Sequence, residues 1–280
     1  MKSGGLVLCV LAMLLTTVDA QTAGRERRQE RRAAAAEEYP ELSQDLQNPL
    51  ARILVLPTAF EYADGGGMAG KGEAFTIRFG PRIPFCLNDR WHLLSKSDLT
   101  YIWQNDVIEG SRQEGFGDFV QTFFFSPDRS LAWDIYWGVG PTFALPTATR
   151  DVLGSGQFSV GPSFGFFRQR DQLTTGVIMN HLWSVSGDSD GAEVNASRIE
   201  PLVAYTFPTA TTLSVGAEFS YNWKTDAWTG PMEMRLTQLT VIKDRPIQWG
   251  LGVRSYPFNE PGEPEWGLVF QLSFPFDSSG

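Results

Sequence analysis

Apolar and polar side chains alternate with a period of two from Ile53 almost to the end of the chain. In residues 213–224, LSVGAEFSYNWK, every second position from Leu213 to Trp223 is apolar or aromatic, and the positions between them are polar or small. Residues i and i+2 share one face of a strand, so this pattern predicts a strand with one apolar and one polar face. The same alternation predicts twelve strands, at residues 53–63, 74–87, 91–104, 115–126, 131–147, 156–169, 173–186, 194–207, 211–224, 230–242, 247–258 and 265–276.

The spacing of these segments is typical of a membrane barrel. Twelve segments share the 224 residues from 53 to 276, which gives about 19 residues for each tilted strand and its connection. Tight connections such as Asn88-Asp89 alternate with longer ones such as residues 64–73, and aromatic residues gather near the segment ends. We therefore predict an all-β transmembrane antiparallel β-barrel of about twelve strands, with a short helical or disordered N-terminal tail. A soluble two-sheet sandwich is the alternative.

The first fifty residues divide into two parts before a barrel at residues 51–280. A basic start at Lys2, the apolar run LVLCVLAMLL and small residues before Gln21 predict a signal peptide over residues 1–20. Residues 21–50 are predicted to form a periplasmic tail, either solvated or an arm that touches a partner or the barrel mouth. Export without an apolar helical anchor leaves three options, a periplasmic protein, a secreted protein or an outer-membrane barrel, and the strand pattern favours the outer membrane of a Gram-negative bacterium. Net charge is -9 with a pI of about 4.8, which disfavours a nucleic-acid partner.

Prolines interrupt several predicted strands and weaken the assignment of inward and outward faces. Three follow glycine, in Gly80-Pro81, Gly140-Pro141 and Gly161-Pro162. Proline cannot donate to a strand ladder, so bulges or kinks are expected there, and these could reverse the facing locally.

If the aromatic positions face lipid, the residues of opposite parity line the lumen. They include six cations and six carboxylates, which we expect to pair across neighbouring strands, either as a structural network or as a polar constriction that selects solutes. Equal numbers argue against strong ion selectivity. The predicted lumen-lining residues are Arg78, Arg82, Lys96, Asp98, Asp118, Asp134, Arg198, Glu200, Glu218, Glu233, Arg235 and Arg254.

The sequence contains few residue patterns that are typical of catalytic sites. Only His92 and His181 are present, and the residues that share a strand face with His181 include no serine. No Cys/His cluster has metal-ligand spacing. We predict that the protein is not an enzyme and has no catalytic, cofactor-binding or metal-binding residues and no cofactor. An outer-membrane lipid hydrolase is the least favoured alternative.

Several short motifs, in this order, carry a resemblance to a known family. They are Gln47-Asn-Pro-Leu50, Gly115-Phe-Gly-Asp118, Phe124-Phe-Ser-Pro127, Gly138-Val-Gly-Pro-Thr-Phe143, Leu145-Pro-Thr-Ala-Thr149, Leu153-Gly-Ser-Gly156, Asn180-His-Leu-Trp-Ser-Val185, Tyr221-Asn-Trp223 and Trp266-Gly-Leu268. Over residues 46–276 the chain resembles the outer-membrane β-barrel family "MetA-pathway of phenol degradation", whose members are also labelled transporter or neuromedin U.

The resemblance implies an outer-membrane channel for the passive uptake of small molecules, aromatic or hydrophobic ones among them. It supplies no catalytic residue. The alternative is a closed barrel that acts as a structural or partner-binding scaffold. Expected partners are outer-membrane lipid and lipopolysaccharide, the barrel-assembly machinery that reads the terminal strand, and a small-molecule solute.

Overall fold

The computed structural model describes residues 39–128, 133–187, 193–243 and 245–276. The predicted signal peptide and the first part of the predicted tail, residues 21–38, lie outside these ranges. Within the described ranges, no helix has both the length and the apolar character needed to span a membrane.

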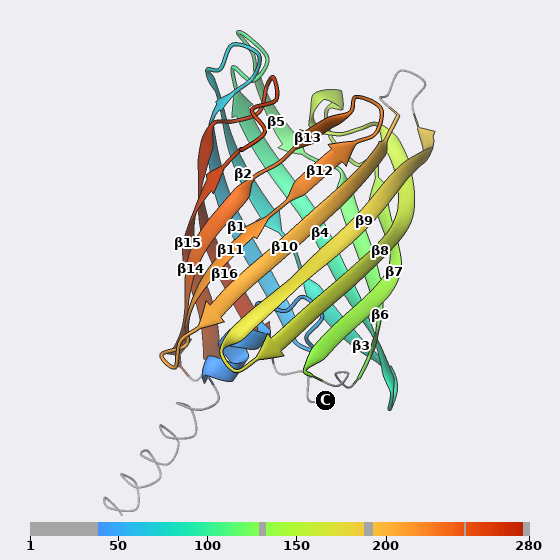
Figure 1. Ribbon diagram of the computed structural model, residues 1–280. Helices are drawn as coiled ribbons and strands as arrows, with labels where there is room; N and C mark the ends of the chain where they lie inside the picture. The colour runs from blue at the N-terminus through green and yellow to red at the C-terminus, as the bar shows by residue number, and fades with distance from the viewer. Residues whose placement is uncertain (1–38, 129–132, 188–192, 244, 277–280) are drawn as a thin grey trace, which may run out of the picture.

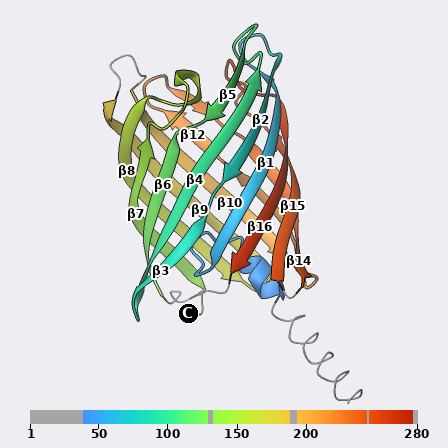
Figure 2. The ribbon, with the colours of Figure 1, turned by 180° about the vertical axis from the view of Figure 1, so that it is seen from behind.

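The described strands form one antiparallel sheet that closes on itself. β1 (Leu54–Gly66) pairs with β16 (Trp266–Phe276) from Leu54 opposite Phe276 to Asp64 opposite Trp266. Figure 2 shows this closure, with the first strand, β1, and the last strand, β16, side by side in the wall. The other segments are β2 (Gly72–Phe79), β3 (Arg82–Asn88), β4 (Trp91–Asn105), β5 (Arg112–Phe116), β6 (Phe119–Pro127), β7 (Ile135–Leu145), β8 (Gln157–Arg170), β9 (Leu173–Gly187), β10 (Asn195–Thr206), β11 (Thr211–Ala217), β12 (Phe219–Asn222), β13 (Ala227–Thr229), β14 (Met232–Ile242) and β15 (Arg245–Ser255).

Four pairs of consecutive segments each follow one another along a single strand position of the barrel wall, which we call a stave. These pairs are β2 with β3, β5 with β6, β11 with β12, and β13 with β14. The described segments therefore form twelve tilted staves, and the predicted all-β twelve-stranded antiparallel barrel is confirmed (Figure 1).

The apolar face of each strand points out of the barrel. In β11, Leu213 and Val215 are 41% and 43% exposed, whereas Thr212 and Ser214 between them are buried. A soluble sandwich would bury the apolar set, so this inversion contradicts that alternative and fits a wall surrounded by lipid.

The Gly-Pro sites do not reverse the facing of their strands. Pro141 lies opposite Pro162, and the register between β7 and β8 stays constant from end to end. The local reversal of facing that such sites could cause does not occur at these two sites, and the register with β4 is also constant across Gly80-Pro81. The glycines have a different role, because a Cβ on Gly140 would lie 1.9 Å from Phe123 O and one on Gly161 would lie 1.6 Å from His181 O. At Gly140 and Gly161 each strand lies so close to the backbone of its neighbour that only glycine fits.

The end of the barrel with short turns is occupied by the chain itself. Residues 39–45 form a short helix that lies at this end, drawn in blue in Figure 1, and residues 46–53 lead from it to β1. We call residues 39–53 the plug. Ser43 donates to Ala210 O at 3.2 Å, and Gln44 Nε2 donates to Asp171 O at 2.9 Å, so the plug is bonded to two of the short turns.

Apolar residues fix the plug in the lumen. Leu50 is 1% exposed and packs with Leu94, Phe124, Phe167 and Ile178, which point inward from the wall. Each fully buried side chain of this kind contributes about 1.5–3 kcal/mol. Of the two alternatives for the predicted tail, its described part agrees with an arm that touches the barrel mouth. In addition, Phe124 and Phe167 face the lumen, because the plug gives them an apolar partner.

Candidate functional site: a charged cavity above the plug

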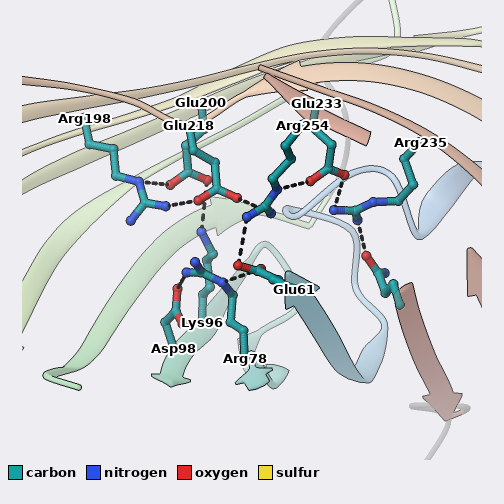
Figure 3. A network of polar contacts seen from close by, with 11 residues as sticks. Glu61, Arg78, Lys96, Asp98, Arg198, Glu200, Glu218, Glu233, Arg235 and Arg254 are labelled. Carbon is teal, nitrogen blue, oxygen red and sulfur yellow. Dashed lines mark hydrogen bonds and ion pairs between the residues drawn. The ribbon is translucent and has the colours of Figure 1, made fainter. Parts of the chain in front are cut away.

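Ten charged side chains from seven staves meet in the middle of the lumen (Figure 3). Strand alternation places them there, since most of them lie between outward-facing apolar residues along their strand. The residues are Glu61 of β1, Arg78 of β2, Lys96 and Asp98 of β4, Arg198 and Glu200 of β10, Glu218 between β11 and β12, Glu233 and Arg235 of β14, and Arg254 of β15.

Arg254 is the centre of this network. Its guanidinium contacts Glu61 at 2.8 Å, Glu233 at 2.7 Å and Glu218 at 3.5 Å, and its side chain is only 6% exposed. Arg235 pairs with Glu233 from the same strand face. The guanidinium and the three carboxylates are each other's partners. Burying any one of these charged groups without a partner would cost free energy.

One contact of the network crosses the lumen. Lys96 Nζ lies 3.2 Å from Glu200 Oε2, and Arg198 Nε lies 3.0 Å from Glu200 Oε1. β4 and β10 are not neighbours in the wall. The sequence-based expectation of pairing between neighbouring strands is met by contacts such as Arg78–Glu61 and not by this one.

The network lines a cavity of about 280 Å³ whose floor is the plug. Leu46, Gln47 and Pro49 of the plug contribute to the lining, together with Phe167, Ile178 and Leu202 of the wall. Of the twelve predicted lining residues, ten border this cavity: Arg78, Arg82, Lys96, Asp98, Arg198, Glu200, Glu218, Glu233, Arg235 and Arg254.

The other two predicted residues lie elsewhere. Asp118 holds the loop between β7 and β8, because its carboxylate accepts from Ala148 N at 3.2 Å and from Ser155 N at 2.7 Å. Asp134 is exposed just before β7, with a positive φ of 59°, so it belongs to a turn. For Asp134 the reason is that strand alternation does not extend into the connections, and for Asp118 it is that the folded β7–β8 loop takes up its carboxylate.

Sequence reasoning missed Glu61, which is bonded to both Arg78 and Arg254. The signal was present, since Glu61 lies between the aromatic residues Phe60 and Tyr62 in a predicted strand. With Glu61 added and Asp118 and Asp134 removed, the described cavity lining has six cations and five carboxylates. The sequence suggested equal numbers of charges, whereas the lining of this cavity carries one surplus positive charge.

The plug also carries a carboxylate, Asp45, which is not among the residues that line the cavity. The Asp45 carboxylate accepts a hydrogen bond from Gln169 Nε2 at 3.2 Å, and the same amide group donates to Gln44 O. Burial raises the pKa of the Asp45 carboxyl, and the hydrogen bond from Gln169 offsets part of that rise. Among the described residues, no group of three or more His, Cys, Asp and Glu side chains is arranged to hold a metal ion.

The outer wall carries a polar cluster that alternation within one strand does not reveal. His181 Nδ1 lies 2.7 Å from Ser197 Oγ, and Trp223 Nε1 donates to the same oxygen at 2.9 Å. His181 also packs against Trp183 with ring centroids 4.2 Å apart. The sequence search for a serine considered only the strand of His181, whereas Ser197 lies opposite it on β10. The described residues include no carboxylate or amide bonded to His181 Nε2.

No protein-family model matches the sequence, and no curated protein matches it. The structure is similar to the COG4313 outer membrane channel from Pseudomonas putida F1, with a TM-score of 0.62 and 13% identity over 80% of this chain and 95% of that chain. Weaker matches are outer membrane phospholipase A from Escherichia coli (TM-score 0.46, 12% identity, 78% of this chain and 95% of that chain) and the KdgM porin (TM-score 0.45, 10% identity, 80% and 99%). At these identities the likeness shows the fold alone, which is that of outer-membrane barrels. Membership of the phenol-degradation family stays a prediction.

Proposed function

We propose that the protein is a bacterial outer-membrane channel for the passive uptake of small molecules, and that the plug controls entry to its lumen. The observation that carries the proposal is the charged cavity inside the barrel, whose floor is the plug. A wall held only by packing would need no charged residues at this depth, and ionisable groups within membrane proteins commonly mark solute pathways. The likeness to a channel fold and the sequence resemblance to a transporter family support the same conclusion.

The orientation follows the usual arrangement of such barrels. Short turns face the periplasm and longer loops face outside, so the plug closes the periplasmic mouth. In this setting the wall contacts outer-membrane lipid and lipopolysaccharide, and the barrel-assembly machinery inserts the chain after signal-dependent export.

Single-channel conductance in a planar lipid bilayer tests the proposal. Three proteins are compared: the chain from Gln21, the same chain without residues 21–38, and the chain without residues 21–50. We expect rare conductance steps in the first two and frequent steps in the third, because only the third lacks most of the plug. The chain without residues 21–38 is the matched control, since it is shortened but keeps the plug.

The alternative is a closed scaffold that binds partners. Its supporting observation is that the plug and the bridge from Lys96 to Glu200 both obstruct the lumen. Absence of steps from all three proteins, each folded by its heat-modifiable migration in gels, would favour the scaffold and contradict the channel.

We also propose that the protein is not an enzyme. A serine hydrolase needs a group that orients its histidine and donors that stabilise the oxyanion, and His181 and Ser197 have no such orienting partner among the described residues. Ester hydrolysis that is lost in Ser197→Ala would contradict this.

A further inference from the structure

Arg82 is the cation responsible for the surplus charge of the cavity. It lies at the start of β3 and lines the cavity, and its guanidinium donates to Leu46 O of the plug at 3.1 Å. Among the described residues, every other cation of the lining has a carboxylate partner within 4.0 Å, whereas Arg82 has none.

The neighbourhood of Arg82 is unfavourable for an unpaired cation. Lys96 lies directly opposite it in the strand register, on the same face. Like charges at such positions repel each other. Glu200 compensates Lys96 at 3.2 Å, but it is also bonded to Arg198, so it has little capacity left for Arg82. The site therefore offers a positive charge whose present partner is only a neutral carbonyl.

Apolar side chains line the same small cavity. Phe167, Ile178 and Leu202 come from the wall, and Leu46 and Pro49 come from the plug. At about 280 Å³, the cavity is just below the range of about 300–1,000 Å³ that is usual for small-molecule sites. It fits a molecule with one ring or a short branched chain.

We propose that the channel binds and passes small monocarboxylates with an apolar body, and that Arg82 is their recognition residue. This rests on the proposed channel function and names its solute class. The carboxylate forms a bidentate pair with the Arg82 guanidinium, and the apolar body packs against Leu202 and Pro49, the partly buried apolar residues of the lining. Arginine is suited to this role because its planar fork matches a carboxylate.

The same contact couples solute binding to the plug. A carboxylate and Leu46 O compete for one guanidinium, and the charge-assisted pair is about twice as strong as a bond to a neutral carbonyl. Bound solute therefore weakens the docking of the plug. By linkage, a ligand that prefers the undocked state shifts the population towards it.

The experiment measures channel opening in planar bilayers for the chain from Gln21, with benzoate, benzamide or acetate added. Benzamide has the ring without the charge, and acetate has the charge without the ring. We expect benzoate to raise the opening frequency several-fold, with little effect from the other two. Arg82→Gln should open more often without solute and should not respond to benzoate. Arg82→Lys should retain a reduced response.

Arg150→Gln is the matched control. Arg150 also donates to a backbone carbonyl, Glu114 O at 3.0 Å, but it is exposed on a loop outside the cavity. This variant should respond as the unaltered chain does. Equilibrium dialysis of labelled benzoate gives a second readout, with an expected loss of about tenfold or more in affinity for Arg82→Gln.

Two failures can be told apart. If the unaltered chain conducts but responds equally to benzoate and benzamide, or if Arg82→Gln keeps its benzoate response, the inference about carboxylates is overturned and the channel remains. If the chain without residues 21–50 does not conduct, the proposed function itself fails.

Discussion

Lys96 Nζ lies 3.2 Å from Glu200 Oε2, although four staves separate β4 from β10 in the wall. This contact joins opposite sides of the barrel, whereas Arg254 joins residues from staves close to its own. We therefore expect Lys96 mainly to restrict passage through the lumen and Arg254 mainly to stabilise the barrel.

Replacing each of these cations by methionine should separate the two contributions. In Lys96→Met, Glu200 keeps Arg198, so the expected cost is about 1–3 kcal/mol and the lumen loses its crossing bridge. In Arg254→Met, three carboxylates lose a shared partner, and the expected cost is about 3–5 kcal/mol. Urea unfolding in lipid measures the stability, and conductance of the open channel should rise in Lys96→Met. A smaller loss of stability in Arg254→Met than in Lys96→Met would contradict this assignment.

Glycine at the Gly-Pro kinks is a steric requirement at some sites and not at others. A Cβ on Gly161 would lie 1.6 Å from His181 O, whereas the nearest atom to a Cβ on Gly80 is 3.5 Å away. We expect Gly161→Ala to prevent correct folding or to cost several kcal/mol, and Gly80→Ala to be tolerated. Heat-modifiable migration after refolding measures both. Because both glycines precede proline, Gly80→Ala is the matched control, and equal yields of folded protein would refute the steric explanation.

Acidification should stabilise the docked state of the plug, because it protonates Asp45. Burial raises the pKa of this carboxyl above its ordinary value of 3.8. Protonation therefore favours the docked state: this stabilisation is fully present below the ordinary pKa and is lost as the pH rises through the higher pKa of the docked carboxyl. Opening frequency should fall from neutral pH to about pH 4, by at most about tenfold for each unit of pKa shift.

Two substitutions test whether Asp45 causes the pH effect. Asp45→Asn removes the titrating carboxyl. The channel should then open rarely, and its opening frequency should no longer fall on acidification. Glu41→Gln is the comparison, because Glu41 is exposed on the same helix and its negative charge helps to raise the pKa of Asp45, so this variant should weaken the pH response without abolishing it. A pH response that survives in Asp45→Asn would assign the effect to another group.

A disulfide between the plug and the wall should hold the channel closed. Ser43 Oγ and Thr212 Oγ1 lie 3.1 Å apart, so cysteines at these two positions are close enough to be joined, in a Cys86→Ser background that removes the free thiol. We expect no conductance from the oxidised protein and restored steps after reduction. Ser43→Cys alone is the control, and conductance by the fully oxidised protein would show that solutes bypass the plug.

The sequence determined the architecture because its signals are local. Alternation such as Phe60-Glu61-Tyr62 assigns each strand an outer and an inner face, and alternating short and long connections indicate that the strands form hairpins. These rules placed most of the charged residues of the cavity in the lumen. They failed for Asp134, because a residue in a turn has no strand face.

Only the tertiary structure decided which of these residues meet and where the plug lies. The bridge from Lys96 to Glu200 depends on the diameter of the closed barrel, which no single strand records. Burial of Leu50 against Phe124 and Phe167 depends on the return of residues 39–53 into a mouth built mostly from later segments. Local periodicity fixes the direction of a side chain, but its partner is set by the closure of distant strands, and that closure leaves Arg82 facing the plug without a carboxylate among the described residues.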